Sequence, residues 1–120
     1  MDRVIDLDLA AVVLVERLAG RPDLQPSPIT WNGFEAAFDE PFKTRRDEVV
    51  DPYSVGVAIR RGEEEGLRVL YAGSWTDMEY WSGDVADDVD LRVPGWDDWL
   101  DLPRFDAVMA EFLSLFRVIT

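Results

Sequence analysis

The sequence predicts an α+β fold, with an antiparallel sheet of three to five strands packed against helices from the N- and C-terminal ends. Apolar residues recur at helical spacing near both ends, whereas those in the middle alternate with polar residues, as in strands. The chain has 120 residues, of which 48% are hydrophobic and 12% aromatic, values typical of a globular protein. We therefore expect residues 1–120 to form a single acidic α+β domain.

The first element is expected to be a helix over residues 8–19. Asp6 or Asp8 can accept the free N–H groups at its start, and Gly20 can end it. Its apolar stripe is expected to consist of Leu9, Val12, Val13 and Leu18. The apolar run 9–15 is too short to span a membrane and follows aspartates rather than the cations of a signal peptide. We therefore expect a cytoplasmic protein with no membrane partner.

The segment between this helix and the sheet is expected to be mostly loop. Residues 21–28 contain three prolines and read as a connection. Residues 29–31 can form a short strand. Phe34 and Phe38 are spaced for one or two helical turns, which Pro41 would end. The basic cluster of residues 43–48, KTRRDE, is expected to pair with nearby acids of the same chain rather than with nucleic acid.

A β-hairpin over residues 53–73 is the centre of the predicted sheet, which we expect to be a meander. Its two alternating runs are separated by GEEEG, so we expect a five-residue loop over residues 62–66. Residues 75–83 are expected to form a third strand. Residues 89–94 are expected to form a fourth, which Pro94 ends.

The last element is the clearest predicted helix. Asp101 and Pro103 are typical of a first helical turn. The apolar stripe is expected to consist of Phe105, Val108, Met109, Phe112, Leu115 or Phe116, and Ile119. Because neither this helix nor the hairpin is stable alone, the stripe needs a sheet face to cover it.

The residue types present exclude several kinds of chemistry. The chain has no histidine and no cysteine, so it cannot form a Ser-His-Asp or Cys-His site and lacks the preferred ligands of zinc. It contains no glycine-rich phosphate-binding motif. The aspartates after Asp84 do not match a calcium-binding loop, because Val89 stands where that loop needs glycine. We expect no catalytic, cofactor-binding or metal-binding residues, and no cofactor.

Charge is distributed unevenly along the chain. Twenty-five acids oppose twelve bases, giving a net charge of −13. Residues 75–111 hold eleven of those acids and two of the bases. Such a surface repels nucleic acid and attracts basic proteins.

The stretch from Trp81 to Asp106 contains eight aspartates and three tryptophans. In one interpretation the tryptophans belong to the core and the aspartates only solvate the loops. In the other, exposed rings and carboxylates form an interface for a basic partner. Trp96 and Trp99 would share a side if residues 96–99 formed a helical turn. The expected partner-binding residues are Asp87, Asp88, Asp90, Trp96, Asp97, Asp98, Trp99 and Asp101.

A short acidic α+β chain with tryptophans among carboxylates resembles the immunity proteins of bacterial toxin–immunity pairs. The resemblance lies in YSVGVAIRRGEEEGLRVLYAGSW, residues 53–75, and GWDDWLDLPRFDAVMAEFLSLF, residues 95–116. It implies a non-enzymatic inhibitor that masks a basic toxin domain, often a nuclease or deaminase. Three alternatives remain open: a DNA-mimic regulator of a DNA-binding protein, a small ligand-binding or carboxylate-based enzymatic domain, and a structural or assembly subunit.

Overall fold

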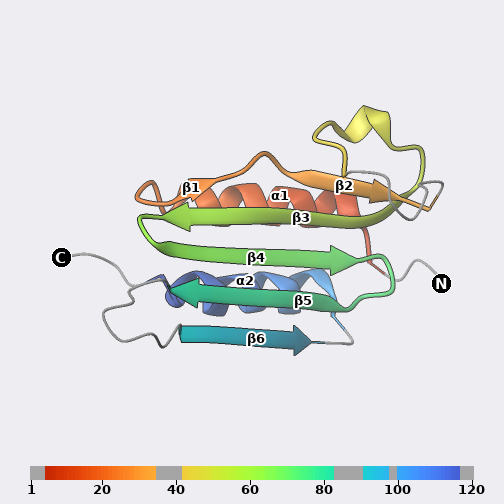
Figure 1. Cartoon of the computed structure of the whole chain (residues 1–120). Coiled ribbons are helices and arrows are strands. Elements are labelled where there is room, and N and C mark those ends of the chain that lie inside the picture. Colours follow the sequence, from red (N-terminus) through yellow and green to blue (C-terminus); the bar gives the residue numbers. More distant parts are fainter. Residues whose placement is uncertain (1–4, 35–41, 83–90, 98–99, 117–120) are drawn as a thin grey trace.

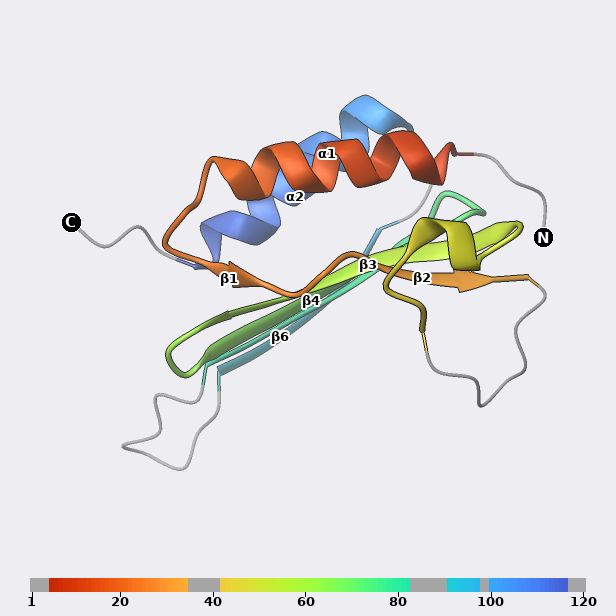
Figure 2. The same cartoon turned by 90° about the horizontal axis from the view of Figure 1, so that it is seen from above.

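The computed structural model describes residues 5–34, 42–82, 91–97 and 100–116. Within them, helices α1 (Leu7–Ala19) and α2 (Leu102–Ser114) lie together on one face of an antiparallel sheet (Figures 1 and 2). The predicted fold class, with helices from both ends of the chain packed on an antiparallel sheet, is confirmed. In the described part of the chain, no helix lies on the opposite face of the sheet (Figure 2).

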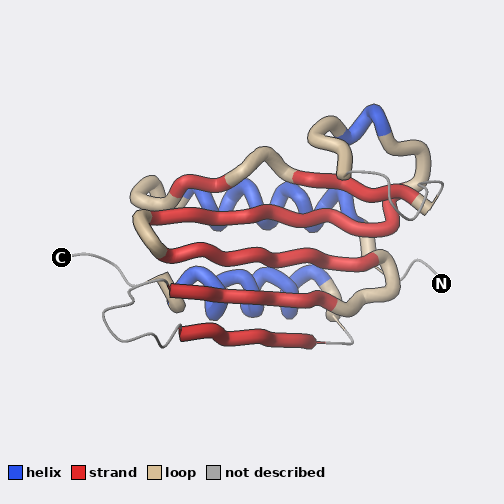
Figure 3. Tube along the Cα trace, in the orientation of Figure 1, coloured by secondary structure: helices blue, strands red, loops and turns tan. Residues whose placement is uncertain are grey.

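The sheet is built around the long central hairpin (Figure 3). Its strands are β1 (Gln25–Pro26), β2 (Thr30–Gly33), β3 (Pro52–Arg61), β4 (Glu64–Tyr71), β5 (Thr76–Ser82) and β6 (Leu91–Asp97). All neighbours are antiparallel in the order β1-β3-β4-β5-β6, and β2 also pairs with β3. Because β1 and β2 occupy successive parts of the same edge of β3, the sheet is five strands wide. A short 3-10 helix, η1 (Arg46–Glu48), precedes β3.

The turn between β3 and β4 is shorter than the expected five-residue loop. Arg61 pairs with Glu64 in the ladder, so only Gly62 and Glu63 form the turn. Gly62 has a φ of 59°, as the first turn residue of a type II′ hairpin requires. The next pair of the ladder brings Arg60 and Glu65 together in an ion pair of 2.6 Å. Opposite charges directly across two strands favour the longer ladder.

Pro94 does not end the fourth predicted strand. It lies within β6, where its Cα pairs with Glu79 of β5. β6 is at the edge of the sheet, and an edge strand tolerates proline because one side of its backbone makes no ladder hydrogen bonds. The expected helical turn around Phe34 and Phe38 falls largely on residues outside the described part of the chain.

Helix α1 has the predicted ends but a different buried stripe. Asp6 accepts hydrogen bonds from the backbone N–H groups of Asp8 and Leu9, at 2.9 and 3.1 Å, and Gly20 is the C-cap. The buried residues are Leu7, Ala10 and Leu14. Of the expected stripe, Val13 and Leu18 are half-buried and pack against the core, whereas Leu9 and Val12 are 51% and 49% exposed. Residues 9–15 are all apolar, so their periodicity cannot show which side of the helix packs on the sheet.

Helix α2 forms as predicted and lies very close to β4. Asp101 is its N-cap, and Pro103 lies in its first turn. Phe105, Val108, Met109, Phe112 and Phe116 are buried, and Ile119 lies outside the described residues. A β-carbon on Gly66 of β4 would be 2.8 Å from Phe112 and 2.7 Å from Phe116. The missing side chain is therefore what allows these two rings to rest on the sheet.

An arginine–aspartate network joins the end of α2 to the strands. Arg21 donates to the carbonyl oxygens of Leu113 and Phe116, at 2.9 and 2.5 Å. The Leu113 carbonyl also accepts from the backbone N–H of Phe116 at 3.0 Å, so Arg21 adds a second donor at the end of the helix, where carbonyl groups have few partners. Asp23 accepts from Arg21 at 3.0 Å and forms an ion pair with Arg61. The hydrogen bond from Arg21, helped by Arg61, lowers the pKa of Asp23 to about 2.

We expect Gly66→Ala to destabilise the fold, because the added methyl group forces Phe112 and Phe116 away from β4. Overpacking of this kind costs about 1–3 kcal/mol, measurable as a lower free energy of unfolding in urea. Gly20→Ala is the matched control, since Gly20 has an ordinary φ of −77° and its nearest contact is 3.4 Å. Equal stability of Gly66→Ala and the wild type would contradict this close packing.

We expect Asp23→Asn to lower stability at neutral pH and to lose its effect in acid. Asp23 has a folded-state pKa of about 2, below its ordinary 3.8, so its ion pairs stabilise the fold above pH 3.8. That contribution disappears as the pH falls toward 2. Urea unfolding of both proteins between pH 7 and pH 2 measures it, with Asp47→Asn, from an exposed pair, as control. A constant difference in stability across this range would show that the charge of Asp23 is not the cause.

Candidate partner-binding surface

The structure leaves most of the predicted partner-binding residues outside its described part. Asp87, Asp88, Asp90, Asp98 and Trp99 are not among the described residues. Trp96 and Asp97 are the last residues of β6 and pair with Asp77 and Thr76 of β5. Residues 96 and 97 therefore do not form the helical turn that would have put Trp96 and Trp99 on one side, because the edge of β5 provides hydrogen-bond partners for an extended backbone.

Asp101 has a structural role in this fold. Its carboxylate accepts a hydrogen bond from the backbone N–H of Arg104 at 2.9 Å. Substitution of such an N-cap residue by alanine costs about 1 kcal/mol. Asp101 is exposed and could reach a binding partner, but its role as helix cap is enough to explain why an aspartate stands at this position.

The face of the sheet opposite the helices provides a second candidate surface, which we call the open face. Successive side chains of a strand alternate between the two faces, and the register shows which residues lie together across strands. The residues of the open face in the three central strands are Ser54, Gly56, Ala58, Arg60, Glu65, Leu67, Val69, Tyr71, Asp77, Glu79 and Trp81. Three of them, Ser54, Gly56 and Val69, are buried. The opposite set, including Val55, Val57, Ile59 and Leu70, is buried in the core.

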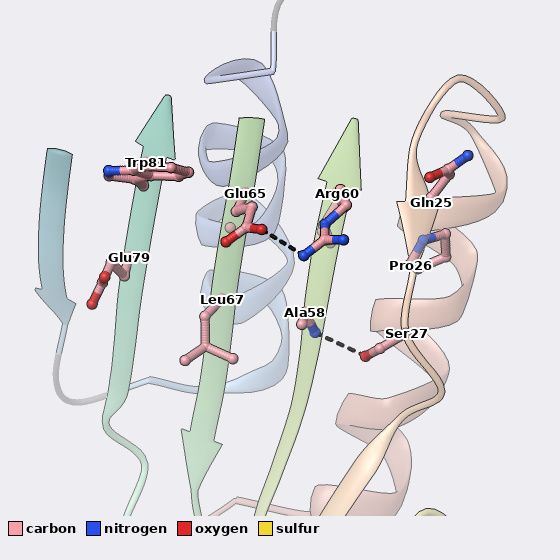
Figure 4. Close-up of a pocket in the computed structure, with 11 residues that line it drawn as sticks. Gln25, Pro26, Ser27, Ala58, Arg60, Glu65, Leu67, Glu79 and Trp81 are labelled. Carbon is pink, nitrogen blue, oxygen red and sulfur yellow. Dashed lines mark hydrogen bonds and ion pairs between the residues drawn. The ribbon is translucent and has the colours of Figure 1, made fainter. Parts of the chain in front are cut away.

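A shallow groove of about 720 Å³ crosses the open face (Figure 4). Its floor includes Ala58 and Leu67, and Leu67 is 45% exposed. One wall is formed by residues 25–27, where Ser27 accepts a hydrogen bond from the backbone N–H of Ala58 at 3.0 Å. The opposite wall is formed by Glu79 and Trp81 of β5 (Figure 4). On β3, the small Ala58 leaves room between the two walls, and Arg60 lines the groove beside it.

Charged and apolar side chains lie next to one another in the groove. Trp81 pairs across the ladder with Glu65, and Glu79 pairs with Leu67. Each carboxylate thus has an apolar neighbour on the adjacent strand. Arg60 lies on β3 with its guanidinium 2.6 Å from the carboxylate of Glu65 (Figure 4). An aromatic ring beside carboxylates is suited to bind a cation.

A row of aromatic rings lies toward the other end of the central strands. Tyr71 stacks on Trp75 with ring centroids 3.9 Å apart and an interplanar angle of 12°. Edge-to-face contacts continue the row from Tyr71 to Tyr53, at 5.6 Å, and from Tyr53 to Phe34, at 5.1 Å. Burial raises the pKa of the Tyr71 hydroxyl, and the nearby charge of Asp77 adds to the effect. The rings are half-buried, except for the exposed Phe34, and such aromatics are common anchors of protein interfaces.

Many of the described arginines are committed to acids of the same chain. The ion pairs are Arg17–Asp106, Arg21–Asp23, Arg45–Asp47, Arg46–Asp8, Arg60–Glu65, Arg61–Asp23 and Arg61–Glu64. Arg45 and Arg46 belong to the predicted basic cluster, so the expectation that it pairs within the chain is confirmed. Because acids outnumber bases by thirteen, this pairing leaves an excess of negative charge for the surface.

Sequence reasoning did not select the open face as a site. The signal was the alternation in β5, where Asp77, Glu79 and Trp81 are interleaved with Met78 and the buried Tyr80. An alternating strand with polar and aromatic residues on one side is normally read as half-buried. Only the position of the helices shows that this side has no covering layer among the described residues.

No three acidic side chains among the described residues gather closely enough to hold a metal ion. None of the helices in the described ranges combines the length and the apolar character needed to cross a membrane.

Comparison of this chain with protein-family models, with curated proteins and with solved structures finds no significant match.

Proposed function

We propose that this chain is a non-enzymatic protein-binding domain, and specifically an immunity-type inhibitor that masks the basic surface of a nuclease-like toxin. The observation that carries the proposal is the open face, on which half-exposed aromatic rings lie among carboxylates. Aromatic side chains supply the packed centre of a protein interface, and charged groups around them choose the partner. The open face combines both kinds of group on a sheet held rigid by two helices.

The charge of the chain supports a basic partner. Its net charge is −13, and its described arginines are largely paired internally. A strongly acidic protein attracts a basic one over several ångströms, which raises the association rate and makes binding sensitive to salt. An inhibitor that must reach its target before that target acts gains directly from rapid association.

The mixture of side chains on the open face favours a protein partner over mimicry of DNA. A DNA mimic needs rows of carboxylates at the spacing of phosphates. Here Leu67 and Val69 separate the open-face carboxylates of β5 from β3, and Trp81 lies beside Glu65. Leu67, which is 45% exposed, and the half-buried Trp81 can contribute to a protein interface by leaving water on binding.

The proposal predicts that the protein, used as bait in a lysate of its native cells, captures a basic partner at low salt and releases it at high salt. The charge reversal Asp77→Lys should weaken binding of that partner at least about tenfold, which corresponds to about 1.4 kcal/mol. Asp77 is exposed on the open face. Calorimetry of the purified pair measures the affinity and the stoichiometry.

Glu16→Lys is the matched control for this experiment. Glu16 is exposed on α1, in the helical layer, and its reversal changes the net charge by the same amount. The proposal requires a larger loss of affinity for Asp77→Lys than for Glu16→Lys. Equal losses would place the interface elsewhere, and a captured protein that is not basic would contradict the proposed class of partner.

A further inference from the structure

We propose that the aromatic row (Phe34, Tyr53, Tyr71 and Trp75) binds an extended, proline-rich segment of the partner, and that a basic residue of this segment pairs with Asp77. The inference rests on the proposed function and names the part of the partner that the open face recognises. The proline rings would pack on the aromatic rings. The polar groups of the aromatic row would donate hydrogen bonds to the carbonyl oxygens of the segment.

The register brings Asp77 to one end of the aromatic row. The backbone N–H of Tyr71 donates to the carbonyl oxygen of Trp75 at 2.9 Å, so these residues lie opposite each other at the ends of neighbouring strands. Asp77 follows Trp75 by two residues, and its side chain therefore points to the same face. Burial and then the charge of Asp77 raise the pKa of the Tyr71 hydroxyl, which is consequently a hydrogen-bond donor at neutral pH.

The aromatic row carries hydrogen-bond donors that the described part of the chain does not use. The hydroxyls of Tyr53 and Tyr71 and the indole N–H of Trp75 make no hydrogen bond to a described residue. The third tyrosine differs, because Tyr80 is buried and its hydroxyl donates to Glu64 at 2.7 Å. Since tyrosine and tryptophan donors that become buried usually need an acceptor, the row favours a partner that offers acceptors.

Asp77 gives the aromatic row a carboxylate that is available to a cation. It is exposed, and no ion pair joins it to an arginine or lysine of the described ranges. Glu65, on the same face, is already paired with Arg60 at 2.6 Å. The residues across the ladder from Asp77 are Val69 of β4 and Trp96 of β6, which carry no charge. The net charge of −13 favours a basic partner over a second copy of this chain.

A polyproline II segment fits this surface better than a helix or a strand does. Its backbone carbonyls have no partners within the segment, so they can accept hydrogen bonds from the aromatic row. A helix uses its carbonyls internally. A partner strand pairs with a sheet edge, whereas Tyr53 and Tyr71 lie on the central strands β3 and β4 (Figure 1). Proline rings are rigid, so they lose little conformational freedom on binding.

The test uses the peptide acetyl-Arg-Pro-Pro-Pro-Pro-Pro-Pro-Arg-amide, which has an arginine at each end so that either direction of binding is detected. The indole N–H signals of ¹⁵N-labelled protein report binding, and Trp75→Phe identifies the Trp75 signal. We expect that signal to move with added peptide and to saturate in the millimolar range. A peptide of the same length and charge with a Gly-Ser core is flexible and lacks the proline rings, so it should bind about tenfold more weakly or worse.

The pairing with Asp77 is tested by a peptide in which citrulline replaces both arginines. It should bind about threefold more weakly than the arginine peptide, the size of an exposed ion pair. Asp77→Asn should weaken the arginine peptide by the same factor and leave the citrulline peptide unaffected. Glu16→Gln on α1 is the control and should bind the arginine peptide as the wild type does. Equal binding of the two peptides by the wild type would contradict the contact at Asp77.

The donors of the aromatic row are tested by removing one hydroxyl. Tyr71→Phe should weaken binding of the proline peptide about threefold, the size of one hydrogen bond. Tyr80→Phe, which removes a hydroxyl bonded within the protein, should leave the affinity unchanged. The inference is overturned if the proline peptide does not move the Trp75 signal, or if the Gly-Ser peptide binds equally well. A Trp75 signal that moves with protein concentration alone would place a second copy on the row and would also overturn it.

Failure of this inference and failure of the proposed function give different results. If a basic partner is captured and Tyr71→Phe and Trp75→Phe bind it as the wild type does, while Asp77→Lys does not, the function stands and the proline-rich segment is wrong. If the proline peptide binds at Trp75 but the captured partner is not basic, the ligand of the aromatic row stands and the proposed inhibitor function fails.

Discussion

The close approach of α2 to β4 is the constraint on which the rest of the structure depends. Phe112 and Phe116 rest on Gly66, where a single added carbon would collide with both rings. Their burial, together with that of Phe105, accounts for much of the apolar surface that α2 removes from water. Because α1 packs on the same side of the sheet (Figure 2), this one face receives both helices. As a result, one face of the sheet is covered by helices and the other face has no helix over it in the described part of the chain (Figure 2).

The two faces of the sheet have different roles: one forms the core, and the other is the proposed binding surface. The helix-covered face supplies the core and includes the buried Arg68, whose guanidinium carbon lies 5.1 Å from the Phe112 ring centroid. Two arginines link the elements around this layer. Arg21 donates to the carbonyl of Leu113 near the end of α2, and Arg17 of α1 forms an ion pair with Asp106 of α2. The open face has no helical cover in the described part of the chain, and Ala58, Arg60, Leu67 and Asp77 are exposed on it. Its rings and carboxylates are consequently arranged in a way that suits contact with another molecule.

The sequence was most informative where local chemistry and hydrophobic pattern agree. Helix α2 combines an N-cap aspartate, a first-turn proline and a narrow apolar stripe, so both its ends and its buried side follow from residue types. Helix α1 also has an N-cap aspartate, but it has no narrow apolar stripe, because residues 9–15 are apolar on all sides of the helix. The length of the turn at Gly62 could not be predicted from the sequence, because Glu64 and Glu65 are residue types common in loops. They belong to β4 because Arg61 and Arg60 lie opposite them on β3. The site was harder still. The density of aspartates predicts a site over residues 87–101, whereas Trp81, Glu79 and Leu67 come together only through strand register.

Hydroxyl-radical footprinting of the free protein and of its complex with the captured basic partner tests most directly the claim that the open face is the binding surface. Our account predicts that Leu67 and Trp81 of the open face, and Trp75, which stacks on the open-face Tyr71, are oxidised in the free protein and protected in the complex. The buried rings of Phe105, Phe112 and Phe116 should resist oxidation in both states. Continued oxidation of the open-face residues in the complex, or their protection already in the free monomer, would contradict the account.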